Sequence, residues 1–70
     1  MHTFTIQSEY TFDDLVEYDA PHAKGRGRIM DIVLAHDRQV YYIILDDNGD
    51  GIGGIYPEHM RLLTPANKGQ

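Results

Sequence analysis

The stretch Val40-Tyr41-Tyr42-Ile43-Ile44-Leu45 decides the fold class of this 70-residue chain. Six apolar residues in succession, most of them β-branched or aromatic, predict a β-strand. The next residues, Asp46-Asp47-Asn48-Gly49-Asp50-Gly51, predict a tight turn because Asn-Gly and Asp-Gly pairs tolerate a positive φ. The centre of the chain therefore predicts a strand, a turn and a returning strand.

Strand patterns recur on both sides of this centre. Residues 57–60 open with a proline and predict a single helical turn, since proline favours the first helical position. Residues 36–39 are predicted as a turn, and residues 21–27 as a loop because they combine a proline, two glycines and a basic cluster. Strands are predicted over residues 1–7, 15–19, 28–35, 40–45, 52–56 and 61–64.

These elements predict an all-β fold, a small five-stranded barrel with one helical turn before the last strand. Closing the sheet removes the exposed edges that a flat sheet of this size would leave. No helical periodicity supports a helix bundle or an α/β fold. We expect a single domain over residues 1–65 and a flexible polar tail over residues 66–70.

Composition excludes several classes of protein. The chain has no cysteine, which removes disulfide scaffolds, thiolate metal sites and cysteine nucleophiles, and it carries a net charge of −5. It has no apolar run of roughly 18 residues and no signal-peptide pattern at its start, so we expect a cytoplasmic protein without a membrane segment. A domain of ~70 residues rarely gains more than about 3–5 kcal/mol of net stability from its core, which makes self-association an expected stabiliser.

The predicted strand over residues 40–45 is apolar on both faces. A one-layer barrel with a single interior predicts polar residues on the outer face instead. The outer residues could be covered by neighbouring segments of a strongly curved barrel, or they could form an exposed patch that binds another copy or another protein. The two alternating sets are Val40, Tyr42 and Ile44 on one side, and Tyr41, Ile43 and Leu45 on the other.

No constellation in the sequence predicts catalysis or a metal site. Asp46, Asn48 and Asp50 match the first half of a calcium loop, but the twelfth position is Pro57, and a hairpin turn explains the same residues. The single serine, Ser8, lies in no nucleophile motif, and the four histidines show no metal-ligand spacing. We therefore expect no catalytic residue, no metal ligand and no cofactor.

Three cations, Lys24, Arg26 and Arg28, alternate with glycines in the predicted loop and its edge. Such a segment could approach phosphates, which would suit RNA. The net charge of −5 and the carboxylates at residues 13–19 favour a solvated loop paired with those carboxylates. Nucleic acid is therefore not the expected partner, and an RNA-binding barrel remains an alternative.

Five short motifs follow one another over residues 10–64: Phe12-Asp13-Asp14-Leu15-Val16, Gly27-Arg28-Ile29, Tyr42-Ile43-Ile44, Ile55-Tyr56-Pro57 and Leu62-Leu63. Their order resembles that of bacterial Src-homology-3-like barrels, which are common among phage and integron-cassette products. This resemblance implies a small barrel of a kind of which many members have no assigned activity.

Within that pattern the nearest enzyme is the type II dihydrofolate reductase, a tetramer that binds NADPH and dihydrofolate in a central pore. Ile55 and Tyr56, followed by a proline, are similar to the late strand of that family. The valine and glutamine that precede them there are replaced by Gly53 and Gly54, and no lysine occurs near Glu17, where the family places one. The resemblance leaves an NADPH- and dihydrofolate-binding tetramer as an alternative function.

Taken together, the sequence predicts a non-catalytic binding module that self-associates or binds a protein through apolar strand faces. Aromatic side chains are favoured contacts because they bury a large area at a small entropic cost. The predicted contact residues are Tyr41, Tyr42, Ile55 and Tyr56, with Lys24, Arg26 and Arg28 on a charged loop at the rim.

Overall fold

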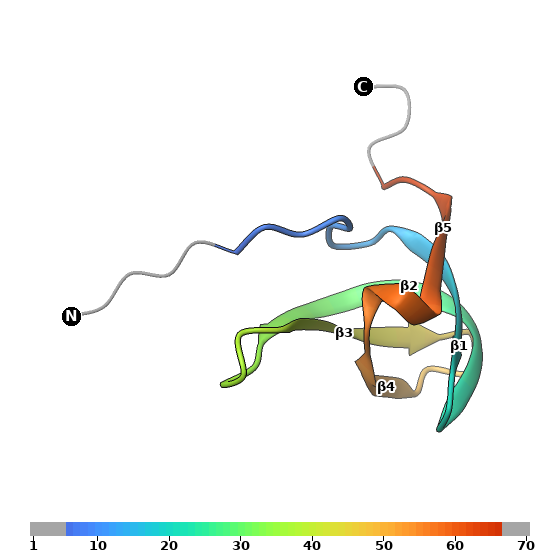
Figure 1. Cartoon of the computed structure of the whole chain (residues 1–70). Coiled ribbons are helices and arrows are strands. Elements are labelled where there is room, and N and C mark those ends of the chain that lie inside the picture. The colour runs from blue at the N-terminus through green and yellow to red at the C-terminus, as the bar shows by residue number, and fades with distance from the viewer. Residues whose placement is uncertain (1–5, 67–70) are drawn as a thin grey trace.

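Five antiparallel strands form one sheet in the computed structural model, which describes residues 6–66 (Figure 1). The sheet order is β4-β3-β2-β1-β5, and a single 3₁₀ turn, η1, precedes the last strand. The predicted all-β class and the helical turn are thus confirmed. The elements are β1 (Leu15–Ala20), β2 (Ala23–Leu34), β3 (Val40–Asp46), β4 (Gly51–Ile55), η1 (Pro57–His59) and β5 (Met60–Thr64).

The long strand β2 gives the sheet its curvature. Its first half pairs with β1 and its second half pairs with β3, and the β2–β3 register shifts between Ile29 and Asp31. A bulge of this kind bends a strand and increases its twist. The edge strands β4 and β5 are joined through η1 at one end (Figure 1). No strand pairing between them closes a barrel within residues 6–66.

A histidine side chain spans part of the open seam. His22 lies in the two-residue turn between β1 and β2, and its Nε2 is 2.9 Å from the carbonyl oxygen of Gly53 on β4. Because a carbonyl only accepts, the imidazole donates this hydrogen bond. The tip of the β1–β2 hairpin is therefore tied to the edge of β4 by one side chain instead of by a strand ladder.

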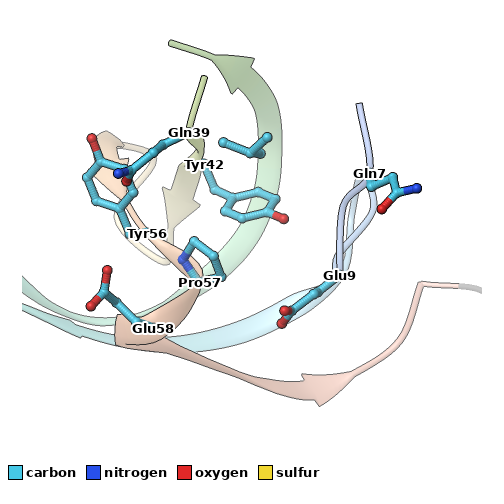
Figure 2. Close-up of a pocket in the computed structure, with 8 residues that line it drawn as sticks. Gln7, Glu9, Gln39, Tyr42, Tyr56, Pro57 and Glu58 are labelled. Atoms are coloured by element: carbon cyan, nitrogen blue, oxygen red, sulfur yellow. The ribbon is translucent and has the colours of Figure 1, made fainter. Parts of the chain in front are cut away.

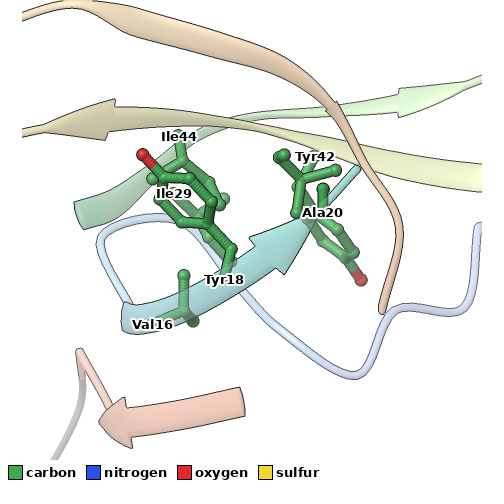
Figure 3. Packing of buried hydrophobic residues seen from close by; sticks show 7 residues of the cluster. Val16, Tyr18, Ala20, Ile29, Tyr42 and Ile44 are labelled. Carbon is green, nitrogen blue, oxygen red and sulfur yellow. The ribbon is translucent and has the colours of Figure 1, made fainter. Parts of the chain in front are cut away.

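The core fills the concave side of the curved sheet (Figure 3). Alternate residues of β1 and β3 point inward, as the period of a strand requires. Tyr10 packs edge-on against Tyr42 at a centroid distance of 5.4 Å and donates to the carbonyl of Met60. The buried apolar residues are Val16, Tyr18, Ala20, Ile29, Tyr42, Ile44 and Ile55.

Most predicted strands are confirmed with small shifts at their ends, but one segment was predicted wrongly. Residues 21–27 were expected to form a loop, whereas only residues 21–22 form the turn and β2 already begins at Ala23. Pairing with β1 over six register positions holds this segment extended. In the strand expected over residues 1–7, residues 1–5 lie outside the described part of the chain, and Ile6 and Gln7 lie outside any strand.

The buried carboxylate of Asp14 holds the turn before β1 and the segment after β5. Its Oδ2 accepts the backbone N–H of Thr11 at 2.9 Å, and its Oδ1 accepts that of Ala66 at 2.7 Å. Asp14→Asn replaces one acceptor with an NH₂ group that faces a donor. We expect the free energy of unfolding to fall by about 1–3 kcal/mol, the range for a buried polar group left unpaired.

Urea unfolding followed by circular dichroism measures this loss. Asp13→Asn is the matched control because it removes the same charge from the adjacent exposed residue, whose φ of 69° asparagine tolerates. Equal unfolding midpoints for the two variants would contradict the proposed role of Asp14.

Candidate interaction surface

The convex side of β2, β3 and β4 carries an apolar surface that we call the outer apolar face, made of Met30, Tyr41, Ile43, Leu45 and Tyr56. Tyr41 and Ile43 are half-buried, whereas Leu45 is 43% exposed and Met30 is 49% exposed. The ring of Tyr56 contacts that of Tyr41 at a centroid distance of 5.9 Å. Neighbouring segments therefore cover this face only in part. The register also places Val33 opposite Tyr41, the exposed Asp31 opposite Ile43 and Arg28 opposite Leu45, so charged side chains border the apolar residues.

Two glycines of β4 leave part of the outer apolar face without projecting side chains. A Cβ atom built on Gly53 would lie 3.9 Å from Cγ1 of Ile43, and one built on Gly51 would lie 3.5 Å from Sδ of Met30. Side chains at these positions would cover the neighbouring apolar groups on β2 and β3. Because both residues are glycine, another molecule can approach Ile43 and Met30 closely.

The predicted contact residues divide between the surface and the core. Tyr41 and Tyr56 lie on the outer apolar face. Tyr42 and Ile55, expected as contact residues, are only 1% and 0% exposed and belong to the core instead. Period two places residues 41 and 42 on opposite sides of β3, so the two adjacent tyrosines cannot both face outward.

The predicted charged loop is instead a row on strand β2. Lys24, Arg26 and Arg28 are exposed there on alternate positions. The register sets Lys24 opposite Asp19 and Arg26 opposite Glu17. The three cations therefore lie on the face of a sheet and not at the rim, because this segment is paired with β1.

Carboxylates and carbonyls accompany these cations. Nε of Arg26 lies 3.5 Å from Asp47, and Nη1 of Arg28 donates to the carbonyl of Asp13 at 2.9 Å. Arg61 of β5 pairs with Glu17 at 2.7 Å. The surface of β1 and the first half of β2, together with Arg61 of β5, is therefore a charged band with both signs, whereas Leu62 and Leu63 of β5 are exposed apolar residues.

The acidic turn after β3 is a self-contained hairpin turn. Oδ1 of Asp46 accepts the backbone N–H groups of Asn48 and Asp50 at 2.9 and 2.8 Å, which is an Asx-type turn. The Asp46 carboxylate thus satisfies the backbone of its own loop. Within residues 6–66, no three histidine, aspartate or glutamate side chains are grouped as ligands of a metal ion.

A cavity of about 330 Å³, which we call the tyrosine–glutamate cavity, was not predicted from the sequence. Figure 2 shows the residues that line it. Its residues come from the segment before β1, the start of β3, and the segment that enters η1. No sequence motif connects these parts, and only the fold brings them together. The cavity is lined by Gln7, Glu9, Gln39, Val40, Tyr42, Tyr56, Pro57 and Glu58.

The charge of this cavity differs from that of other hollows on the molecule. Its only ionisable groups of full charge are the carboxylates of Glu9 and Glu58. The hollow beside Leu15 contains Arg26 and Arg28 as well as two carboxylates, and the hollow beside Tyr18 and Gly25 contains Lys24 and Arg26 as well as two carboxylates. The tyrosine–glutamate cavity is thus anionic, whereas these neighbouring hollows carry both signs.

Burial raises the pKa of two tyrosines. It raises the pKa of the Tyr10 phenol, with further contributions from the charges of Glu9 and Tyr42. It also raises the pKa of Tyr18, with contributions from Asp46 and Asp47. Tyr10 donates a hydrogen bond to the carbonyl of Met60, and Tyr18 is part of the buried core.

No family model, curated protein or solved structure matches this chain. Among the described residues, no helix is long and apolar enough to cross a bilayer. The molecule itself offers two candidate sites, the outer apolar face and the tyrosine–glutamate cavity.

Proposed function

We propose that this chain is a small non-catalytic interaction module that self-associates through its outer apolar face. The observation that carries the proposal is the apolar character of β3 on both sides, although only its concave side contacts a core. Apolar residues gathered on the outside of a small domain are typical of an interaction site. Burying them in a contact with a second copy would add stability that the small core lacks.

A second copy suits this face for two reasons. The surface is flattened by Gly51 and Gly53, so two faces can approach each other closely. The adjoining charged band carries both signs, including the pairs Arg26–Asp47 and Arg61–Glu17. In a two-fold dimer each surface contacts the same surface of the second copy. A charged band that contains both cations and carboxylates can therefore face its copy without net electrostatic repulsion.

We also infer that the sheet is a Src-homology-3-like barrel of the open kind. The order β4-β3-β2-β1-β5, the shared long strand β2, and the 3₁₀ turn between β4 and β5 support this assignment. The bond from His22 to Gly53 supports it too, because it joins the β1–β2 hairpin to the β4 edge. Such a scaffold leaves the outside of the strands free for contacts between proteins.

Sedimentation equilibrium tests the self-association. The expected result for the natural chain at high micromolar concentration is a mass that is a multiple of 8.0 kDa. Leu45→Lys places a charge in the proposed contact, and we expect the dissociation constant of the assembly to rise at least about tenfold, equivalent to about 1.4 kcal/mol. Circular dichroism verifies that the variant is folded.

Leu63→Lys is the matched control because the same change is made at a residue that is 37% exposed on β5, away from the outer apolar face. It is expected to keep the mass of the natural chain. A natural chain that sediments as a monomer at high micromolar concentration contradicts the proposal, and so does equal weakening by both substitutions.

A further inference from the structure

We propose that His22 is an autoinhibitory strap, which keeps the free edge of β4 from pairing with β4 of a second copy. β4 lies at the end of the sheet, so one side of its backbone has no strand beside it within residues 6–66 (Figure 1). An unpaired edge is a template for strand addition, and proteins protect such edges. This contact is distinct from the outer apolar face, because it would use backbone groups of a strand edge and not side chains of the convex side.

The imidazole of His22 lies against two consecutive residues of this edge. Its Nε2 donates to the carbonyl oxygen of Gly53 at 2.9 Å. A Cβ atom built on Gly54 would lie 3.8 Å from both Cε1 and Nε2 of the same ring. Because both residues are glycine, no side chain of theirs separates the ring from the backbone. The tip of the β1–β2 hairpin therefore covers this part of the edge, where an added strand would lie.

The ladder between β3 and β4 is irregular at the point that His22 contacts. Gly53 and Gly54 together face the single residue Ile43 of β3, where the register shifts. Such a bulge leaves the extra residue outside the regular ladder, and Gly54 adopts a positive φ of 69° there. His22 brings a donor to this point from a distant part of the chain, so the Gly53 carbonyl is satisfied without a second strand.

A second copy of β4 suits the edge that the strap covers. The strand has the sequence Gly-Ile-Gly-Gly-Ile and carries no charged side chain, although charges are a common protection of strand edges. Its three glycines allow another backbone to approach without a steric clash. A two-fold axis would set the two edges antiparallel, and each would offer the other the same N–H and carbonyl groups.

Sedimentation equilibrium of His22 variants tests the proposal. His22→Ala and His22→Ser both remove the ring and its Nε2 donor, and each is made in the natural chain and in the Leu45→Lys chain, whose outer apolar face is disrupted. We expect the weight-average mass at high micromolar concentration to be about double that of the parent in both backgrounds, because the edges pair in twos. Amides of residues 51–55 are expected to exchange more slowly with solvent, and circular dichroism verifies folding.

Three further variants are matched controls. His22→Gln keeps an N–H donor the same number of bonds from the backbone as Nε2, and we expect it to keep the mass of its parent. His36→Ala makes the alanine change at an exposed histidine in the turn between β2 and β3, and it is expected to change nothing. Gly53→Lys, added to His22→Ala in the Leu45→Lys chain, sets like charges along the paired edges and is expected to restore the parent mass.

Three results would overturn the proposal. One is an unchanged mass for both His22→Ala and His22→Ser at high micromolar concentration. Another is an equal increase in mass for His36→Ala, and the third is an increase that persists with Gly53→Lys, which would place the contact away from β4. Self-association through the outer apolar face is judged separately, because it concerns the mass of the parent chains before His22 is changed.

Discussion

Ile44→Ala is expected to leave a large part of the chain unfolded at room temperature. Ile44 is fully buried at the centre of β3, and its register partners are Ile29 and Ile52. Truncating a buried isoleucine to alanine costs about 2–5 kcal/mol, because the loss of apolar contact is added to the cost of a cavity. A core of this size supplies about 3–5 kcal/mol of net stability, so one substitution can remove most of it.

The measurement is urea unfolding followed by far-ultraviolet circular dichroism. Ile44→Val provides a graded control, with an expected cost of about 0.5–1.5 kcal/mol. Leu63→Ala removes a comparable side chain from an exposed site of β5, and we expect a change within about 0.5 kcal/mol. The assignment of Ile44 to the core is disproved if Ile44→Ala and Leu63→Ala unfold at the same urea concentration.

The second half of the chain was predictable because its signals are local. The apolar run of β3, the Asx-rich turn at residues 46–50 and the proline that opens η1 each determine their own conformation. The alternation of Val40, Tyr42 and Ile44 also identified one face of β3 before its partners were known. Each of these elements can be predicted from its own residues and their immediate neighbours in the sequence.

The first half of β2 was missed because its extended form depends on a distant partner. Glycines and cations at residues 24–28 are typical of a loop, but β1 pairs with each of these residues. One signal was present, since cations and glycines alternate with the period of a strand. The inward positions hold Gly25 and Gly27, so the pattern lacks the apolar side chains that normally reveal it.

The candidate sites were predicted only in part. Period two separates Tyr41 from Tyr42, but it does not say which of them faces the core, and both were included as contacts. The position of Ile55 in the core depends on its register with Tyr42, which the sequence alone does not define. Glu9 and Glu58 are far apart in the chain, so their shared cavity arises only from the tertiary fold.

The character of the outer surface changes along β2. Before Ile29 the exposed positions carry the cations of the charged band, and after it Met30 begins the outer apolar face. One strand thus contributes to both surfaces because it pairs with β1 first and with β3 afterwards. Where β2 changes partner from β1 to β3, its conformation depends on the distance between β2 and β3. The absence of a side chain at Gly27 allows this distance to be short.

Gly27→Ala is expected to cost about 3 kcal/mol of unfolding free energy, the upper part of the range for an overpacked core. A Cβ atom at this buried position would overlap the carbonyl oxygen of Leu45 and would lie 2.8 Å from Cγ2 of Ile44. Backbone atoms of β3 cannot rotate away as a flexible side chain can. The two strands would have to separate where the sheet bends, which would weaken their hydrogen bonds.

Gly53→Ala is the matched control, because the same methyl group added on β4 would lie 3.9 Å from its nearest neighbour, Cγ1 of Ile43. We expect its stability to change by no more than about 1 kcal/mol, with a gain if the loss of chain entropy in the unfolded state dominates. Urea midpoints of the two variants at one protein concentration make the comparison. If Gly27→Ala is as stable as Gly53→Ala, β2 and β3 do not approach as closely as described, and residues 24–28 can be a loop after all.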